Sequence, residues 1–391
     1  MTPAARLQAA IEILDEVVAS ARADGPPADA IVSHYFRSRR YAGSKDRRAV
    51  RELAFSAIRL CAECPENGRS AILALAAKDQ SLVPLFGEPR GPAALDGTEE
   101  AARPGVVPDW LQAELSSLVT PHEWPMLLER APLDLRVNVS RTSREAVVSA
   151  FDHASATPLS PWGIRLPPDT RVDDHLAFRE GLFEVQDEGS QLIALACTPT
   201  GGEHLIDLCA GAGGKSLAIA AAQPETHVLA TDSNRVRLGR LAPRAERAGA
   251  SIETRLLSPP HELAELSEWT DRADLVLIDA PCSGSGTWRR NPEGRWRLVP
   301  ERLDRLVALQ QRLLGIGASL VRPGGLLVYA VCSLLSCEGA AQIGHFLEGR
   351  SSWISEQTPI SGGRRDGAGL LLTPGHDQTD GFFVARLRRP C

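Results

Sequence analysis

Two cysteine motifs in the second half of the chain contain residues that can carry covalent chemistry. Asp279-Ala-Pro-Cys-Ser-Gly284 and Tyr329-Ala-Val-Cys-Ser333 each follow an apolar stretch that predicts a β-strand. A cysteine thiolate is a strong nucleophile, although a single cysteine in such a stretch is more often a small core residue. Because the carboxyl ends of neighbouring parallel strands meet at one edge of a sheet, the two thiols together predict a shared reaction site.

A glycine-rich segment, Asp207–Ser216, follows another predicted strand and opens a helix. Its three glycines, Gly211, Gly213 and Gly214, lack Cβ, so the backbone can turn sharply and approach a ligand closely. The next predicted strand ends at Asp232, where an acidic side chain reaches the hydroxyls of a ribose. The spacing predicts a site for an adenosine-containing cofactor, and the alternative is a tight turn that binds nothing.

Three cofactor classes compete for this segment. A phosphate-binding Walker loop requires glycine six residues before Lys215, where this chain has Cys209. A dinucleotide fingerprint that starts at Gly211 requires its third glycine where Ser216 stands. S-adenosylmethionine remains, because it carries no phosphate and needs no phosphate cradle.

The elements that must position these motifs follow from hydrophobic periodicity. Helical spacing predicts helices over 4–22 and 48–60, and residues 84–108, rich in Gly, Pro and acidic residues, predict a long loop. An alternating strand is predicted over 133–139, followed by extended pieces over 157–168. Strands and helices then alternate, which is typical of a parallel α/β sheet. The six strands are predicted over 204–208, 227–230, 252–257, 274–278, 325–331 and 382–387.

The helix before the fifth of these strands shows one apolar face, formed by Leu306, Leu309, Leu313 and Ile316. We expect Pro323-Gly324-Gly325 to end it.

Composition indicates a soluble globular protein with two to three domains. The chain has 391 residues, of which 43% are hydrophobic and 24% charged, and it shows neither a signal peptide nor an apolar run long enough to span a membrane. We therefore expect a cytoplasmic protein whose eight cysteines stay reduced. Cys61 and Cys64 form a C-x-x-C pair without a second pair or suitably spaced histidines, so we expect a structural role and no metal.

Charge is unevenly distributed. The net charge is −6, yet residues 31–60 hold eight basic and two acidic residues. A basic segment on an acidic protein predicts a polyanion contact, and the alternative is a solvated helix face. A second arginine-rich stretch with two tryptophans predicts a hold on an RNA strand, with core packing of the tryptophans as the alternative. Its residues are Trp288, Arg289, Arg290, Arg295, Trp296 and Arg297.

Five motifs in register resemble the RsmB-type (Sun-related) RNA 5-methylcytosine methyltransferases. The motifs are Gln186–Gln191, Asp207–Ser216, Asp279–Gly284, Tyr329–Ser333 and Thr379–Phe383. In addition, Pro132–Asn138 resembles the strand that starts the family's RNA-facing subdomain, and Ala42–Arg48 resembles part of its NusB-like domain. Five motifs in order are far more specific than any one of them.

The resemblance implies a mechanism. Cys332 would add to carbon 6 of a cytosine, Cys282 would help to break the adduct, and Asp279 would interact with ring nitrogen 3. The target base must leave its stack to enter the site. S-adenosylmethionine is the implied cofactor, and the residues expected to bind it are Cys209, Ala210, Gly211, Ala212, Gly213, Gly214, Lys215, Asp232 and Asp279.

The chain departs from the family pattern at three places. Val331 stands where the family usually has Thr, and Ala212 stands where it usually has Pro. The family places an Asp after the third strand to hold the adenine amino group, but Leu256–His261 contains none.

Together, pattern and resemblance predict an α/β fold: a Rossmann-like class I methyltransferase sheet, a small α+β RNA-facing subdomain and an all-α NusB-like N-terminal domain. The expected domains are 1–125, 126–200 and 201–391. We expect a monomer that binds RNA and no membrane, with ribosomal RNA favoured over tRNA by analogy. The alternatives are a tRNA methyltransferase and an RNA-binding assembly factor on a decayed methyltransferase fold.

Overall fold

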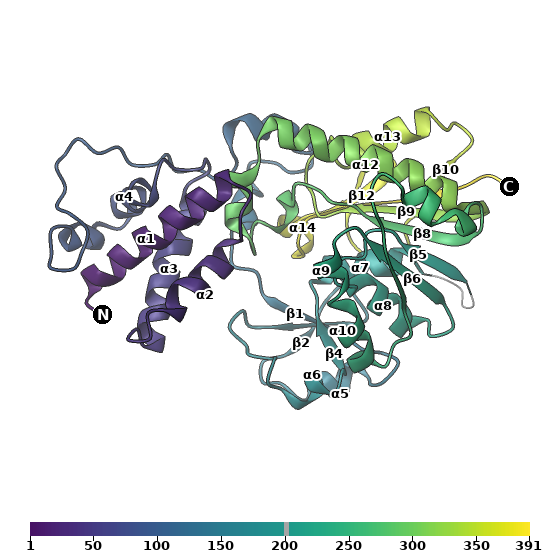
Figure 1. Ribbon diagram of the computed structural model, residues 1–391, viewed down its shortest axis with the longest axis horizontal. Coiled ribbons are helices and arrows are strands. Elements are labelled where there is room, and N and C mark those ends of the chain that lie inside the picture. The colour runs from purple at the N-terminus through teal and green to yellow at the C-terminus, as the bar shows by residue number, and fades with distance from the viewer. Residues whose placement is uncertain (199–202) are drawn as a thin grey trace. The chain divides into compact units, whose positions relative to one another are not determined.

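The computed structural model describes residues 1–198 and 203–391, so the predicted domain boundary at residue 200 lies outside the described residues. Contacts divide the chain into two compact units (Figure 1). The helical unit comprises Met1–Leu115, Thr120–Glu129 and Thr287–Pro300. The sheet unit comprises Ser116–Val119, Arg130–Gly286 and Glu301–Cys391. No helix within the described ranges combines the length and apolar character needed to cross a membrane.

Four α-helices build the helical unit: α1 (Pro3–Arg22), α2 (Ala28–Arg37), α3 (Ser44–Leu60) and α4 (Gly68–Lys78). Short 3-10 turns accompany them: η1 (Gln80–Leu85), η2 (Asp109–Glu114), η3 (Trp124–Leu127) and η6 (Pro292–Arg297). The Thr2 side chain accepts a hydrogen bond from the backbone N–H of Ala5 and so caps α1. Apolar faces of all four helices share one core, in which Leu7, Leu14 and Ile58 are fully buried.

The second arginine-rich stretch lies inside this unit, and its predicted hold on RNA is wrong for the residues that are buried. Trp296 packs in the helical core and donates from Nε1 to the carbonyl of Cys61 at 2.9 Å. Arg295 is 1% exposed and donates to backbone carbonyls, including that of Val106 at 2.6 Å. Trp288 and Arg289 are buried as well. Burial of these side chains places them out of reach of a phosphate.

The sheet unit is built on a large mixed sheet in the order β11-β12-β13-β9-β8-β5-β6-β7, with β10 also paired to β13. Its strands are β5 (His204–Asp207), β6 (His227–Asp232), β7 (Glu253–Leu256), β8 (Ala273–Asp279), β9 (Val321–Val331), β10 (Ile354–Glu356), β11 (Arg364–Asp366), β12 (Gly369–Leu372) and β13 (Phe382–Arg388). The pairings among β5 to β9 are parallel, and those made by β10 to β13 are antiparallel. Each of the six predicted strands matches one of these to within a few residues.

Helices cover both faces of this sheet. The α-helices of the unit are α5 (Arg144–Val148), α6 (Leu176–Arg179), α7 (Glu188–Ala196), α8 (Gly214–Ala222), α9 (Arg235–Leu238), α10 (Leu241–Ala248), α11 (Glu262–Glu265), α12 (Pro300–Leu320), α13 (Ala340–Glu348) and α14 (Pro374–Asp377). Helices α7 and α8 share a core with Leu205 and Leu275. On α12, Gly317 lies against Ile278 and Leu327, where a Cβ would meet their side chains at 2.7 and 2.9 Å. Residues of opposite parity along a strand face opposite sides, so α12 covers the other face.

The predicted end of α12 differs from the structure. The helix ends at Leu320 and β9 begins at the next residue, so Pro323 lies within the strand. The pairing of β9 with β8 shifts register between Val321 and Leu326. A proline cannot donate to a ladder, and an irregular strand start tolerates it.

A smaller antiparallel sheet in the order β2-β3-β1-β4 forms the rest of the sheet unit. Its strands are β1 (Leu133–Val137), β2 (Ser155–Ala156), β3 (Gly163–Leu166) and β4 (Phe183–Val185). Leu135, Ile164 and Phe183 fill its own core and are fully buried. Buried Arg136 on β1 donates to the Gln186 side chain at 2.7 Å and also to the carbonyl of Gly214 in the glycine-rich segment. The α/β fold with an N-terminal helical region is the predicted one.

Candidate active site

Four strand ends gather the predicted motifs at one edge of the large sheet. Asp207, Asp232, Asp279 and Val331 are the last residues of β5, β6, β8 and β9, which are neighbours in the order β9-β8-β5-β6. These strands run parallel, so their carboxyl ends share an edge. The glycine-rich segment and both cysteine motifs therefore leave the sheet on the same side.

The two motif cysteines are in contact. Sγ of Cys282 lies 3.4 Å from Sγ of Cys332. The backbone supports this approach, because the N–H of Ala280 donates to Ala330 O at 2.9 Å and the N–H of Gly286 donates to Cys332 O at 3.1 Å. The hydrogen bond to Cys332, together with burial, raises the pKa of the Cys282 thiol well above its usual value. Cys282 therefore keeps its proton at neutral pH and can donate to Cys332.

An acid–base pair stands beside the thiols. Nζ of Lys215 donates to Oδ2 of Asp279 at 2.6 Å, and the side chains are 10% and 30% exposed. Burial works against the ammonium, but the Asp279 carboxylate outweighs it, so the pKa of Lys215 is raised. The pair offers a fixed charged donor and a carboxylate next to the two sulfurs.

The glycine-rich segment folds back onto the end of β6. Gly211 and Gly213 have φ of +57° and +79°, and a Cβ on Gly213 would meet Leu241 at 2.4 Å. The carboxylate of Asp232 accepts from the backbone N–H of Gly211 at 2.8 Å and from that of Asn234 at 2.6 Å. These bonds hold the segment and the strand end in one arrangement.

Asp207, at the start of the segment, lies in the interior. It is 1% exposed and accepts from Oγ of Ser216 at 2.6 Å. Burial raises the pKa of Asp207 to about 7. The hydrogen bond anchors the helix that follows the glycines, because Ser216 lies in the first turn of α8.

A cavity of about 670 Å³ opens along this edge. The volume lies in the range of roughly 300–1,000 Å³ that is usual for ligand pockets. Of the predicted site residues, Cys209, Asp232, Asp279, Cys282 and Cys332 line it. The predicted cofactor residues from Ala210 to Lys215 form the adjacent turn and, in the described part of the chain, are not among the lining residues.

Several residues that line the cavity do not follow from the sequence motifs. Glu262 of α11 is 4% exposed, and Nη1 of Arg312 donates to both of its carboxylate oxygens, at 2.8 and 2.9 Å. The spacing of the α12 leucines predicts a helix face but does not indicate that the face borders a ligand site. The residues that the motifs miss are Arg237, Glu262, Arg302, Leu306, Leu309, Arg312 and Leu313. The sequence signal for these residues was Arg312, a charged residue between Leu309 and Leu313 of the apolar face.

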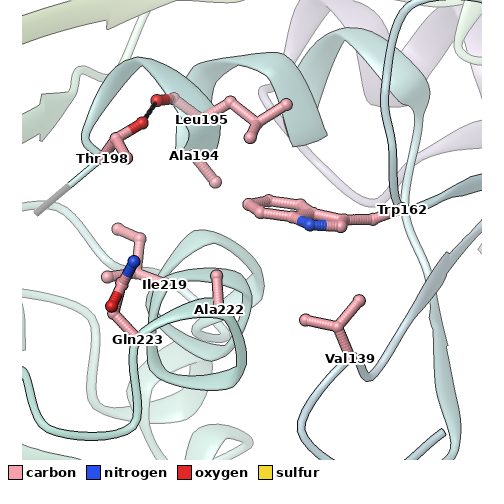
Figure 2. Close-up of a pocket in the computed structure, with 8 residues that line it drawn as sticks. All are labelled: Val139, Trp162, Ala194, Leu195, Thr198, Ile219, Ala222 and Gln223. Carbon is pink, nitrogen blue, oxygen red and sulfur yellow. Dashed lines mark hydrogen bonds between the residues drawn. The ribbon is translucent and has the colours of Figure 1, made fainter. Parts of the chain in front are cut away.

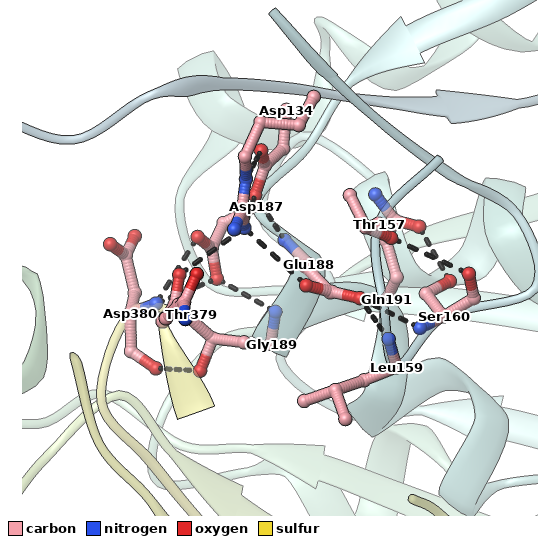
Figure 3. A network of polar contacts seen from close by, with 12 residues as sticks. Asp134, Thr157, Leu159, Ser160, Asp187, Glu188, Gly189, Gln191, Thr379 and Asp380 are labelled. Atoms are coloured by element: carbon pink, nitrogen blue, oxygen red, sulfur yellow. Dashed lines mark hydrogen bonds and ion pairs between the residues drawn. The ribbon is translucent and has the colours of Figure 1, made fainter. Parts of the chain in front are cut away.

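Two further motifs act as links between segments. Asp187 accepts from the backbone N–H groups of Gly189 and Asp380, and Glu188 accepts from those of Leu159 and Ser160 (Figure 3). The network joins the segment before β3, the start of α7 and the segment before β13. The first and last of the five motifs thus position the sheets and do not line the cavity.

A second, apolar cavity of about 240 Å³ lies between Trp162 and residues of α7 and α8 (Figure 2). Among the residues that the structure describes, none with an ionisable side chain lines this cavity, so it offers no acid, base or nucleophile. Its lining residues are Val139, Trp162, Ala194, Leu195, Thr198, Ile219, Ala222 and Gln223. Within the described ranges, no group of three or more potential metal-binding side chains occurs either.

Solved structures show the same fold. A protein named PH0851 aligns over 100% of this chain and 99% of its own, with a TM-score of 0.77 and 21% identity. NSun6 from Pyrococcus horikoshii, solved with SFG, aligns over 68% of this chain and 92% of its own, with a TM-score of 0.61 and 18% identity.

Sequence comparison identifies the family. The small-subunit ribosomal RNA methyltransferase B of Salmonella arizonae is 33% identical over 290 residues, which cover 72% of this chain and 66% of the relative. The enzyme of the same name from Pectobacterium carotovorum is 33% identical over 294 residues, with the same coverage. The alignments thus span slightly less than two thirds of these relatives' length. The model of the 16S rRNA methyltransferase RsmB/F family matches residues 194–388, which contain the glycine-rich segment and both cysteine motifs, and the chain belongs to this family.

Proposed function

We propose that this protein transfers a methyl group from S-adenosylmethionine to carbon 5 of a cytosine in RNA, and that the RNA is small-subunit ribosomal RNA. The observation that carries the proposal is the contact between the Cys282 and Cys332 thiols beside the Asp279–Lys215 pair. The names of the curated relatives support the choice of RNA. We further propose that the protein acts in the cytoplasm as a monomer.

The thiols divide the covalent work. Carbon 5 of cytosine is a weak nucleophile, and addition of the Cys332 thiolate to carbon 6 makes it enamine-like. We assign Cys332 as the nucleophile because its motif, Tyr329–Ser333, resembles the family motif whose cysteine adds to carbon 6. The bound cofactor supplies the methyl group. Cys282 would give its proton to ring nitrogen 3 as the adduct forms, and its thiolate could then accept the carbon-5 proton. Loss of that proton breaks the bond between Cys332 and carbon 6 and returns the Cys332 thiolate, and nitrogen 3 releases its proton to solvent.

Asp279 would hold the ring during this sequence. Addition at carbon 6 makes nitrogen 3 more basic, so that it takes up a proton, and a carboxylate that accepts a hydrogen bond from this N–H stabilises the adduct. Asp279 lines the cavity together with both cysteines and is fixed by Lys215. A carboxylate held this way needs no reorganisation when the adduct forms.

The cofactor would lie in the same cavity, with Asp232 on its ribose and Glu262 at the adenine end. Adenine presents an amino donor and a ring-nitrogen acceptor on one edge. The buried Glu262 carboxylate can accept from the amino group, and Arg312 can donate to the ring nitrogen. This pair replaces the Asp that Leu256–His261 lacks.

We propose three domains: a NusB-like RNA-binding domain within residues 1–125, an RNA-facing subdomain over 126–200 and the methyltransferase domain over 201–391. RNA would also contact the first of these, which lies in the helical unit. Basic side chains on α2, α3 and their connection are exposed, and Tyr41 among them is 74% exposed. Exposed cations with an aromatic side chain suit a nucleic-acid strand. We call this the arginine-rich face; its basic residues are Arg37, Arg40, Lys45, Arg47, Arg48 and Arg51.

A denaturing gel with substrate RNA tests the chemistry. The Cys282→Ala variant should transfer the methyl group but remain attached to its RNA, giving a slowly migrating band. The Cys332→Ala variant should give neither methylation nor a band. A band with Cys332→Ala alone would reverse the two roles, and no band with either variant would exclude covalent catalysis by this pair.

Two further measurements on the wild-type protein test the alternative functions. Calorimetry with S-adenosylmethionine distinguishes an enzyme from an assembly factor on a decayed fold, because the latter should not bind the cofactor. Transcripts of tRNA in place of ribosomal RNA distinguish the two substrate classes: faster methylation of tRNA would contradict the proposed substrate.

A further inference from the structure

A fully buried carboxylate, Glu338, lies behind the two cysteine motifs and has no part in the chemistry described above. It is 0% exposed. Its Oε1 accepts from the backbone N–H of Ser283 at 2.8 Å and from Nε2 of Gln310 at 2.9 Å. Its Oε2 accepts from Oγ of Ser333 at 2.6 Å and from Oγ of Ser283. Four donors thus satisfy one carboxylate in the interior.

Three of these four donors come from the two segments that carry the thiols. Ser283 directly follows Cys282, and Ser333 directly follows Cys332. Each segment is a loop past the end of a strand, and apart from backbone bonds such as that from Gly286 N–H to Cys332 O, it is held by the side chains next to the cysteines. A single carboxylate that binds both serines couples the position of one cysteine to that of the other.

Gln310 of α12 anchors the carboxylate to the scaffold. Its Nε2 also donates to the carbonyl of Pro281 at 2.9 Å, and its Oε1 accepts from Gln342 at 3.2 Å. The hydroxyl of Tyr329 on β9 donates to the backbone carbonyl of Glu338 at 2.7 Å. Glu338 is therefore held from a helix and from a strand, and it can act as a fixed point for the two loops.

We propose that Glu338 is a positioning residue that sets the distance between the Cys282 and Cys332 thiols by holding Ser283 and Ser333 to one carboxylate. The inference rests on the proposed function only for its effect on catalysis, since the spacing of the thiols can be measured without RNA. A carboxylate suits this task because each of its oxygens can accept two hydrogen bonds, and a neutral side chain of similar size cannot accept four.

The experiment measures binding of phenylarsine oxide to the full-length protein. This reagent bridges two thiols through one arsenic atom and releases water, so its affinity depends on the distance between two sulfurs. Signal from other cysteines is removed by subtracting a Cys332→Ala sample. Glu338→Ala should weaken bridging at the Cys282–Cys332 pair by about tenfold or more, because the effective concentration of the second thiol falls.

Matched variants separate positioning from loss of stability. Glu188 is also 0% exposed. It accepts from the backbone N–H groups of Leu159 and Ser160 and pairs with Arg165, and these partners do not belong to the segments that carry the thiols. Glu188→Ala should lower the melting temperature and leave arsenical bridging unchanged. Glu338→Gln, which keeps the reach of the side chain, should bridge more tightly than Glu338→Ala. If Glu338→Ala does not fold, Glu338→Asp, with a shorter reach, should still weaken bridging.

Catalysis provides a second readout. Glu338→Ala should lower kcat by about 10²-fold, as expected when reacting groups are displaced by about 1 Å, and leave KM for RNA near its normal value. Unchanged arsenical bridging in folded Glu338→Ala or Glu338→Asp would overturn the proposal, as would equal weakening in Glu188→Ala. A different outcome is that Glu338→Ala weakens arsenical bridging while the wild-type protein methylates no cytosine. That result would refute the proposed function and leave the positioning role of Glu338 intact.

Discussion

The crevice at the carboxyl edge of the large sheet and the arginine-rich face of the helical unit differ in how their functional groups are held. In the crevice, Lys215 is bound to Asp279, and the neighbouring Glu338 has four hydrogen-bond donors. On the arginine-rich face, the basic side chains are exposed, and of these Arg47 donates to the Ala42 carbonyl at 2.9 Å and Arg51 pairs with Asp29. Buried groups act at fixed distances and are individually indispensable, whereas exposed charges act through their number.

The two arginines of η6, Arg295 (buried) and Arg297 (half-buried), sharpen this contrast. They belong to the same residue type and the same helical unit as the arginine-rich face. Arg297 donates to the carbonyl of Gly25 at 2.8 Å, and burial lowers the pKa of Arg295 to about 9. An arginine-rich sequence therefore predicts a nucleic-acid contact only where the guanidinium groups remain exposed.

The largest expected effect is in the crevice. Asp279→Asn should lower kcat by about 10²- to 10³-fold, because the ring nitrogen loses a charged partner as the adduct forms. The affinity for S-adenosylmethionine should change far less. Single-turnover methylation measures the first quantity and calorimetry the second.

The control for this variant lies on the same strand. Asp274, near the other end of β8, is ion-paired with Arg322, with Nε to Oδ1 at 2.6 Å. Asp274→Asn should leave methylation within about twofold, since substitutions away from a site have small effects. A similar loss in both variants would show that the Asp279 effect is structural.

An intermediate effect is expected at the two ends of the cofactor. Asp232→Ala should weaken binding of S-adenosylmethionine by about 1–3 kcal/mol, because charge-assisted hydrogen bonds are removed. Glu262→Gln should weaken it by about 0.5–1.5 kcal/mol, because an amide oxygen can still accept from the adenine amino group. The measurement is calorimetry with S-adenosylmethionine and with S-inosylmethionine, which lacks that amino group. It shows which variant affects the adenine end of the cofactor and which affects the ribose.

The comparison between the two ligands is decisive for Glu262. The wild-type protein should bind S-adenosylmethionine more tightly than S-inosylmethionine. Glu262→Gln should reduce this preference more than Asp232→Ala does. If folded Asp232→Ala bound S-adenosylmethionine normally, Asp232 would not belong to the site. An unchanged preference in Glu262→Gln would place the adenine elsewhere.

The smallest single effects are expected on the arginine-rich face. Neutralising Arg37, Arg40 and Arg48 together, each to Gln, should weaken RNA binding and reduce the slope of log affinity against log salt by about 0.7–0.9 for each phosphate that is no longer neutralised. Each single substitution should weaken binding only about 2- to 5-fold at moderate salt. Filter binding over a salt series measures both.

A matched triple variant tests whether position or total charge matters. Arg272, Arg322 and Arg350 are exposed and belong to the sheet unit, and the first two stand at the amino ends of β8 and β9. Their neutralisation changes the net charge equally and should leave the salt slope unchanged. An equal change of the salt slope in both triple variants would mean that RNA binding depends only on the net charge of the protein.

Most of the architecture was predictable from local pattern. The six strands of the sheet unit and helices α1 and α3 follow from apolar periodicity, because strand and helix periods differ. The end of α12 was not predictable, since a Pro-Gly-Gly sequence normally ends an element, and here the strand begins before it. Tertiary pairing with β8 determines that boundary.

The sequence by itself determined which residues are candidates for the chemistry. Asp232 and Asp279 end predicted strands, and Cys282 and Cys332 follow them. Residue type and the shared edge of parallel strands were enough to predict one site, and the structure confirms that the strands are neighbours. Membership of the RsmB/F family follows from the same motifs.

Only the tertiary structure decided how those residues are supported. Glu338, Gln310 and the Glu262–Arg312 pair come from elements whose sequences show only helix or loop character. The burial of η6 likewise depends on packing against α1 and α3, far away along the chain. Hydrogen-bond partners and burial arise from contacts between distant segments, and no local pattern of residue types contains them.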